Sequence, residues 1–350
     1  MKHVLRQLSI WLIFPLLVAA SSWLSQASPI IAVENALRLA RAVTLDMQSS
    51  FVNTLLFSKD GRTLVSGDRN GEVGLWDVGT WSRRVVLPAR STEAEDAEAG
   101  VAFWGTLALT PDGRTIVRAY GSDGGVAGYD LAGNELFSLS YGARVYALAV
   151  SPDGMYLAVS GIRNSVMICD VVRRELVQDI AVDHEYILNL DFAPDGRTLL
   201  GACERPDNVL KTWDVGTWRE TASVSPVADR VDFHDALYSP DGREIAVAQR
   251  LGVKQDAEIL FVDPATWERT REFSDHTRAP YQLAFSPDGK LLASAGDDGT
   301  VRLWDLTGNR QLSVLRVGGE VGAVAFSTDG TLLAFAIWER GVQIWAVPPE

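Results

Sequence analysis

One four-residue pattern recurs seven times along the chain and constrains the fold more than any other feature. The pattern ends in Asp-Gly, usually after Pro, and successive copies are 41 to 52 residues apart. Pro presets φ for a turn, Asp bonds the backbone that follows it, and Gly tolerates positive φ. The spacing therefore predicts seven tight turns in a repeated unit. The Asp residues of the seven turns are Asp60, Asp112, Asp153, Asp195, Asp241, Asp288 and Asp329.

Hydrophobic segments on both sides of each turn have the length of β-strands. VNTLLF precedes the first turn and RTLVSG follows it. A third segment usually ends in a large aromatic residue and Asp, as at Trp76-Asp77 and Trp304-Asp305, and a polar turn leads into a fourth. Four short strands per unit of about 45 residues are typical of a propeller blade. The sequence thus predicts seven four-stranded antiparallel blades.

Two segments carry a family resemblance: LLASAGDDGTVRLWD (291–305) and TLVSGDRNGEVGLWD (63–77) resemble WD40 repeats. The resemblance extends from about residue 35 to 347 and implies an all-β, seven-bladed β-propeller, which we expect to occupy residues 28–350. The last repeat stops at its third strand, at residues 345–347. We expect residues 35–45 to supply the missing outer strand, because a closed ring leaves no free break between blades.

The first 27 residues have the layout of a secretory signal peptide. Lys2 and Arg6 precede an apolar run at 8–20, and Ser25 and Ala27 are small residues suited to the −3 and −1 positions of a cleavage site. We expect cleavage after Ala27 and a periplasmic or extracellular protein of bacterial origin. The alternative is an uncleaved membrane anchor.

Charge and cysteine content narrow the classes of partner. Loss of Lys2 and Arg6 with the signal takes the formal net charge from −13 to −15. Nucleic-acid binding needs Lys and Arg against phosphates, so nucleic acid and anionic membrane surfaces are unfavourable partners. We expect a monomer that binds a protein or peptide. Cys169 and Cys203 are expected to be buried thiols rather than a disulfide. The acidic segment 91–100 is expected to be a solvated loop; a site for a cation or a basic partner is the alternative.

The resemblance also implies where a partner binds. In WD40 proteins the face that carries the strand-four-to-one and strand-two-to-three loops commonly does so, and we call it the entrance face. Tyr, Trp and Arg are enriched among residues that dominate binding energy. The expected partner-binding residues, at the starts of first strands, are Arg144, Tyr146, Tyr186, Asp232, Tyr281 and Glu320.

The sequence offers little chemistry beyond binding. The resemblance implies that His276, Ser294, Asp298 and Trp304 form a structural hydrogen-bonded network, although His, Ser and Asp also suit a catalytic triad. His234, beside Asp232 and Asp235, is a weak metal candidate. We therefore expect no catalytic residue, metal or cofactor, and a non-catalytic interaction scaffold outside the cytoplasm. The alternatives are a propeller enzyme, lactonase-like or cofactor-dependent, with a central-channel site, and a TolB-like periplasmic propeller.

Overall fold

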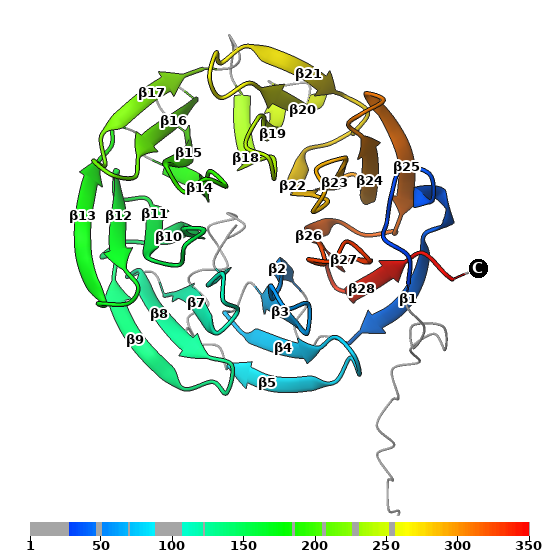
Figure 1. The fold of residues 1–350 in the computed structure, drawn as a ribbon, viewed down its shortest axis with the longest axis horizontal. Helices are drawn as coiled ribbons and strands as arrows, with labels where there is room; N and C mark the ends of the chain where they lie inside the picture. The colour runs from blue at the N-terminus through cyan, green and yellow to red at the C-terminus, as the bar shows by residue number, and fades with distance from the viewer. Residues whose placement is uncertain are drawn as a thin grey trace, which may run out of the picture.

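The computed structural model describes residues 28–46, 51–68, 71–87, 107–121, 123–183, 186–204, 208–225, 231–251 and 256–349. They form seven four-stranded antiparallel sheets arranged as blades in a ring (Figure 1). This confirms the predicted fold. Within the described ranges the one helical element is a 3₁₀ turn, η2 (Ala36–Arg38), and no helix there is long and apolar enough to cross a membrane.

Each blade runs outward from the ring axis through four consecutive strands, except in the seventh. Blade 1 comprises β2 (Val52–Phe57), β3 (Thr63–Asp68), β4 (Val73–Asp77) and β5 (Arg83–Leu87), and blade 2 comprises β6 (Leu107–Leu109), β7 (Thr115–Tyr120), β8 (Gly125–Asp130) and β9 (Glu135–Ser140). Blade 3 comprises β10 (Val145–Val150), β11 (Tyr156–Gly161), β12 (Ser165–Asp170) and β13 (Glu175–Ala181), and blade 4 comprises β14 (Tyr186–Phe192), β15 (Thr198–Glu204), β16 (Val209–Asp214) and β17 (Glu220–Val224).

The remaining three blades complete the ring. Blade 5 comprises β18 (Val231–Tyr238), β19 (Ile245–Leu251), β20 (Asp256–Val262) and β21 (Arg269–Phe273), and blade 6 comprises β22 (Pro280–Phe285), β23 (Leu291–Gly296), β24 (Thr300–Asp305) and β25 (Arg310–Arg316). Blade 7 comprises β26 (Val321–Phe326), β27 (Leu332–Ile337), β28 (Gly341–Ala346) and, as its outer strand, β1 (Ala40–Leu45).

The ring is closed by pairing between its first and last strands. β1 runs antiparallel to β28, from Ala40 opposite Ala346 to Leu45 opposite Val342 (Figure 1). Leu45 is completely buried. The predicted closure is confirmed, but the strand begins at Ala40, because η2 occupies the preceding residues and buries Ala36 in the core between blades 6 and 7.

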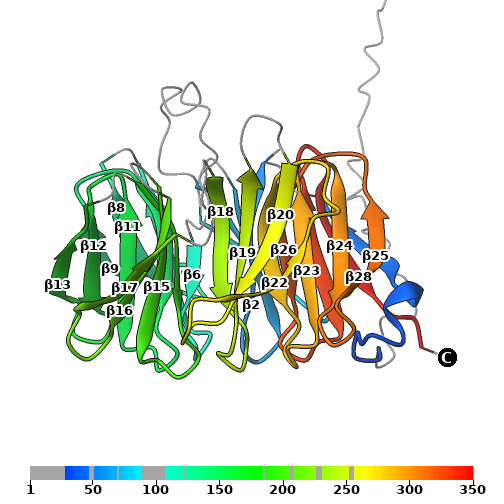
Figure 2. The same cartoon turned by 90° about the horizontal axis from the view of Figure 1, so that it is seen from above.

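The up-and-down order of strands gives the ring two distinct faces (Figure 2). Turns between first and second strands and between third and fourth strands lie on one face, which we call the turn face. In blade 1 the Ser58 hydroxyl donates to Asp60 at 2.6 Å and accepts from the Thr63 amide at 2.9 Å, while Gly61 takes φ of 68°. The same serine or threonine hydroxyl bond to Asp recurs in blades 2, 3, 5, 6 and 7. Blade 4 has Ala193 instead, and Asp195 keeps only the amide half of the unit, from Arg197 at 2.9 Å.

The hydrophobic core lies between neighbouring blades. One cluster joins blades 3 and 4 and another joins blades 5 and 6. Cys169 and Cys203 lie in different clusters as free, buried thiols, as expected, and burial raises their pKa values to about 11 and about 12.

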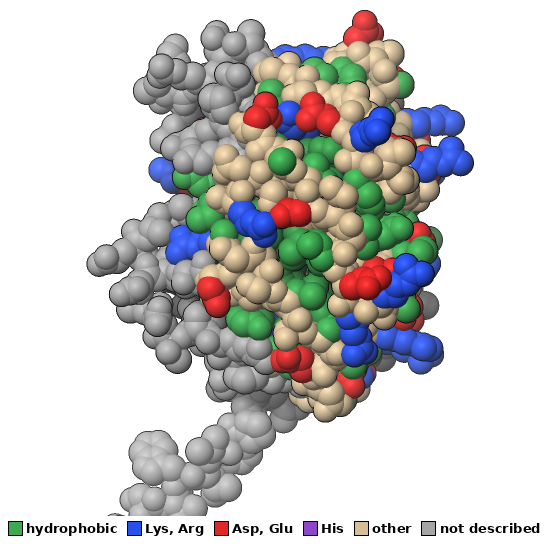
Figure 3. All heavy atoms as spheres, turned by 90° about the vertical axis from the view of Figure 1, so that its left-hand side faces the viewer, with side chains coloured by type: hydrophobic (Ala, Val, Ile, Leu, Met, Phe, Trp, Pro, Cys, Tyr) green, Lys and Arg blue, Asp and Glu red, His purple; other side chains and the backbone are tan. Residues whose placement is uncertain are grey.

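Blade 3 differs from the rest of the described ring at its outer side. Figure 3, which looks at this side, shows hydrophobic side chains between charged ones. Val172 is 77% exposed and Leu176 is 57% exposed. Apart from two residues of the N-terminal segment, Ile30 and Leu37, the exposed large hydrophobic residues of the described chain all belong to this blade: Met155, Ile162, Val172, Leu176 and Val177.

Candidate functional site

Two aromatic clusters occupy the entrance face. The first, which we call the tyrosine pair, joins blades 3 and 4. The rings of Tyr146 and Tyr186 lie 6.1 Å apart, and Arg144 hydrogen-bonds Tyr146. Burial raises the pKa of Tyr146, which is only 5% exposed, whereas Arg144 and Tyr186 are half-buried. The structure thus brings three of the expected partner-binding residues together, with Tyr146 mainly a support for the other two.

The second cluster, which we call the aromatic row, spans four blades. His234 of blade 5 packs edge-on against Tyr281 of blade 6 at 5.5 Å. Tyr281 stacks on Trp338 of blade 7 at 5.8 Å, and Trp338 meets Phe51, just before β2 of blade 1, edge-on at 5.6 Å. All four side chains are half-buried. Gly322 makes room for the row, because a Cβ there would lie 2.2 Å from the Trp338 indole nitrogen.

Charged residues flank the aromatic row. Asp232 forms an ion pair with Arg250, whose Nε lies 3.0 Å from the carboxylate. Arg278 lies 3.4 Å from Asp297, and Glu320 hydrogen-bonds Asp297. Burial, and then the charge of Asp297, raises the pKa of Glu320. The entrance face therefore presents aromatic rings flanked by positive and negative charges. Such a face can contact a peptide that has both apolar and charged side chains.

Burial controls the protonation of the aromatic row itself. It lowers the pKa of His234 to about 4, so the imidazole is neutral at neutral pH. It also raises the pKa of Tyr281, which keeps its phenol protonated. The row therefore presents neutral rings, and charge is confined to its flanks.

Trp338 is the main residue of the face that first-strand register does not reveal. It lies in the turn between β27 and β28 of blade 7. The equivalent position in blade 6 is Asp297, in the turn between β23 and β24. A tryptophan in a turn that is mostly polar in the other blades, with Ile162 of blade 3 as an exception, is the sequence signal that identifies it. The acidic segment 91–100 and the leader 1–27 lie outside the described residues.

Polar side chains tie the first strands of adjacent blades together near the ring axis. Asp191 accepts from the Tyr238 amide, and Asp235 accepts from the Leu283 amide, each at 2.8 Å. Asn189 also donates to Asp235 at 2.7 Å. Burial raises the pKa of both carboxyls to about 7. These groups therefore connect blades 4, 5 and 6, and they titrate near neutrality.

The expected hydrogen-bonded network of blade 6, formed by His276, Ser294, Asp298 and Trp304, is present and is closed to solvent. Ser294 accepts from the Trp304 indole at 2.9 Å and contacts His276 Nε2 at 2.7 Å, while His276 Nδ1 contacts Asp298 at 3.0 Å. These bonds place the imidazole proton on Nδ1. The contacts match those of a catalytic triad, but Ser294 is completely buried, so no substrate reaches its hydroxyl. The network satisfies buried polar groups.

The candidate metal residues are not brought together. Asp232 is engaged by Arg250, and Asp235 accepts from Asn189 and the Leu283 amide. Within the part of the chain that the structure describes, no three His, Cys, Asp or Glu side chains form a group that could hold a metal ion.

Comparison with known proteins fits this architecture. Residues 42–77 and 267–305 match the family model of the WD domain, G-beta repeat. These two segments are similar to WD40 repeats. It is 26% identical over 202 residues to Periodic tryptophan protein 2 of Arabidopsis thaliana, 27% over 217 residues to Protein groucho of Drosophila melanogaster, and 41% over 83 residues to Small ribosomal subunit protein RACK1 of Candida albicans.

These matches cover only part of each protein. They span 57%, 60% and 24% of this chain, respectively. Each covers about a quarter of the relative's own length: 22%, 28% and 26%. Among solved structures, Kuenenia stuttgartiensis Hydrazine Synthase superposes with a TM-score of 0.72 at 20% identity, over 85% of this chain and 96% of that one. That likeness shows a common fold. The WD40 matches favour a WD40 propeller over the TolB-like alternative.

Proposed function

We propose that this WD40 propeller is an exported, non-catalytic interaction scaffold that binds a protein or peptide partner on its entrance face. The aromatic row is the observation that carries the proposal. Half-buried Tyr and Trp side chains flanked by ion pairs resemble the centre and rim of a protein interface. The neutral rings and the mixed flanking charges fit a peptide surface better than a polyanion.

Paired variants of the two clusters test this proposal. Arg144→Ala with Tyr186→Ala removes the tyrosine pair, and Tyr281→Ala with Trp338→Ala cuts the aromatic row. Partner capture from a native envelope fraction should fall at least about tenfold in one or both double variants, because aromatic hot spots each contribute about 2 kcal/mol or more. Thermal unfolding checks that the ring remains intact.

A matched control uses the outer side of blade 3. Val172→Ser with Leu176→Ser changes exposed apolar side chains away from both clusters. Capture should stay at the level of the unmodified protein. Full capture by both entrance-face variants, or its loss in the blade 3 control alone, would place the binding surface elsewhere.

Export is supported by the charge and apolar pattern of residues 1–27. The mass of the protein recovered from its native cell envelope tests it. Cleavage after Ala27 leaves Ser28 as the first residue. A mass that includes residues 1–27 in a membrane fraction would instead indicate an uncleaved anchor, and recovery from the cytoplasm would contradict export.

An enzyme remains the second candidate because of one observation. Asp191 and Asp235 have pKa values of about 7, which suit general acid–base chemistry. Both carboxyls, however, accept amide hydrogen bonds from the next blade, which explains their positions without a substrate. Turnover that disappears in Asp235→Asn, in a variant that still folds, would favour the enzyme.

A further inference from the structure

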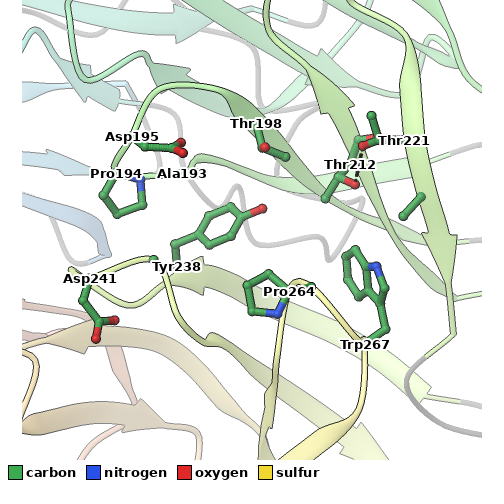
Figure 4. Close-up of a pocket in the computed structure, with 13 residues that line it drawn as sticks. Ala193, Pro194, Asp195, Thr198, Thr212, Thr221, Tyr238, Asp241, Pro264 and Trp267 are labelled. Atoms are coloured by element: carbon green, nitrogen blue, oxygen red, sulfur yellow. Dashed lines mark hydrogen bonds between the residues drawn. The ribbon is translucent and has the colours of Figure 1, made fainter.

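A cavity of about 470 Å³ opens on the turn face, between blades 4 and 5. Residues from β15, β16 and β17 form one wall, and the other comes from β18 and the two turn-face turns of blade 5 (Figure 4). This volume is within the range of small-molecule sites, about 300–1,000 Å³. The cavity is on the opposite face from the tyrosine pair and the aromatic row, so it is separate from the proposed partner surface.

The Tyr238 hydroxyl is the central polar group of the cavity. Tyr238 is 7% exposed, its phenol points into the cavity, and its hydroxyl has no hydrogen-bond partner among the described residues (Figure 4). Burial raises the pKa of Tyr238, so the hydroxyl remains a donor. A buried tyrosine hydroxyl usually has a partner, and a ligand in the cavity would supply one.

Packing alone does not require this hydroxyl. Tyr238 stands four residues before its turn glycine, where four other blades have phenylalanine: Phe57, Phe192, Phe285 and Phe326. A phenyl ring therefore fills the same place in the frame. The hydroxyl is an addition specific to blade 5, and it opens toward the cavity.

Further hydroxyls surround Tyr238. Thr198 borders the cavity, and the hydroxyls of Thr212 and Thr221 lie 2.9 Å apart, with Thr221 also donating to the Thr212 carbonyl at 3.1 Å (Figure 4). Asp195 lies at the edge, in the one turn that lacks a serine or threonine hydroxyl. The wall thus offers donors and acceptors side by side.

Apolar surface completes the cavity. Trp267 is half-buried at one side, in a turn that holds it at φ of 62°, and Pro264 adds a ring beside it (Figure 4). A tryptophan in the left-handed region is uncommon, because its Cβ is crowded there. The turn fixes the indole as one side of the cavity.

The lining excludes two of three ligand classes. It has no Lys or Arg, and it includes the carboxylates of Asp195 and Asp241, so an anion is unfavourable. The same carboxylates would attract a cation, but a cation accepts no hydrogen bond and so cannot pair with the Tyr238 donor. The remaining class is a neutral molecule that donates and accepts hydrogen bonds and has an apolar face for the indole. We propose that this cavity binds a neutral saccharide ring.

A corresponding cavity between blades 2 and 3 lacks most of these features. It measures about 420 Å³. There Leu136 replaces Thr221, Arg174 replaces Trp267, and Val150 stands where Tyr238 does. Thr115 keeps the hydroxyl that Thr198 supplies. The space itself is therefore a property of the frame, whereas the Tyr238 hydroxyl, the Thr212–Thr221 pair and the indole distinguish the cavity between blades 4 and 5 from this one.

Saturation-transfer NMR on the purified protein, with glucose, galactose, N-acetylglucosamine and maltose as probes, tests the proposal. We expect at least one probe to bind in the millimolar range. Tyr238→Phe should weaken it about five- to tenfold, the size expected for one neutral hydrogen bond. Trp267→Ala should abolish it. Trp218→Ala, at the same turn position of blade 4 but outside this cavity, should leave binding unchanged.

Tyr238→Phe also separates binding from structure. Without a ligand, this variant should melt at about the same temperature as the unmodified protein, because the Tyr238 hydroxyl opens to the cavity and bonds no described residue. Absence of binding by every probe, equal binding by Tyr238→Phe, or binding of methylguanidinium in place of the saccharides would each overturn the proposal. None of these results bears on partner capture at the entrance face.

Discussion

On the turn face, six of seven blades carry the same Ser/Thr–Asp hydrogen-bonded unit, whereas on the entrance face the described side chains differ from blade to blade. The repeated turn units on one face keep the strands in register. The side chains on the other face can therefore differ from blade to blade. The tyrosine pair, the aromatic row and their ion pairs all occur where repetition ends. The difference indicates that the repeated units of the turn face maintain the frame, and it is consistent with the partner surface proposed for the entrance face.

Deletion of residues 35–45 breaks the frame and should have the largest effect. It removes the buried side chains of Val43 and Leu45 and the ladder to β28. We expect a loss of about 5 kcal/mol or more in the free energy of unfolding, from burial of about 1.5–3 kcal/mol per large side chain plus backbone pairing. Thermal unfolding checks this, and an unchanged melting temperature would show that β1 does not close the ring.

Ser294→Ala tests a part of the frame that is not repeated in every blade. It leaves the Trp304 indole and His276 without their shared partner inside the core. We expect a loss of about 2–3 kcal/mol, since each unpaired buried group costs about 1–3 kcal/mol. Ser66→Ala in blade 1 is the control, because Ser66 bonds the Trp76 indole at 2.9 Å without a histidine. Equal losses of unfolding free energy in the two variants would show that the unpaired His276 adds nothing to the cost of Ser294→Ala.

Asp235→Asn tests, through the pH dependence of stability, the hydrogen bonds that connect the first strands of blades 4, 5 and 6. Burial raises the pKa of Asp235 from 3.8 to about 7, so between these values the folded state holds a proton that the unfolded state has lost. This contribution to stability is full below pH 4 and falls as pH rises to 7. The variant should flatten that decline, and its amide can donate to Asn189 Oδ1, which is buried without a partner.

Denaturant midpoints between pH 4 and 8 measure the effect. Asp241→Asn is the opposite control, because the Ser239 hydroxyl holds the pKa of Asp241 below 3.8. Stability from Asp241 is present above its unfolded pKa of 3.8 and is lost only as pH falls below that value, so Asp241→Asn should leave the slope between pH 4 and 8 unchanged. An unchanged slope in Asp235→Asn would show that Asp235 is ionised throughout this range.

Ala193→Ser restores the missing hydroxyl in blade 4 and should have the smallest effect. The new hydroxyl would donate to Asp195, as Ser151 does to Asp153 in blade 3 at 2.5 Å. We expect a gain of about 0.5–1 kcal/mol in the free energy of unfolding. Ser151→Ala should lose a similar amount. A loss in Ala193→Ser would mean that the turn of blade 4 follows a different geometry.

Sequence alone predicts the frame well, because each blade repeats a local signal. The turn glycines fixed the strand positions, and the incomplete last repeat located β1, although the 3₁₀ turn of Ala36–Arg38 shortened it. The site was harder to predict. Trp338 meets Phe51 only after the ring closes, and the cavity beside Tyr238 depends on two blades packed together. Contacts between repeats leave no local pattern in the sequence.

Closure by β1 also orders events during folding. Its partner β28 lies some 300 residues later in the chain, so this pairing closes the longest loop among the sheets. Until residue 346 has been synthesised, β1 has no strand to pair with, and its apolar side chains stay exposed. Such intermediates expose sheet edges that aggregate. A chain that places β1 in the same blade as β28 therefore depends on protection of β1 until β28 has been synthesised.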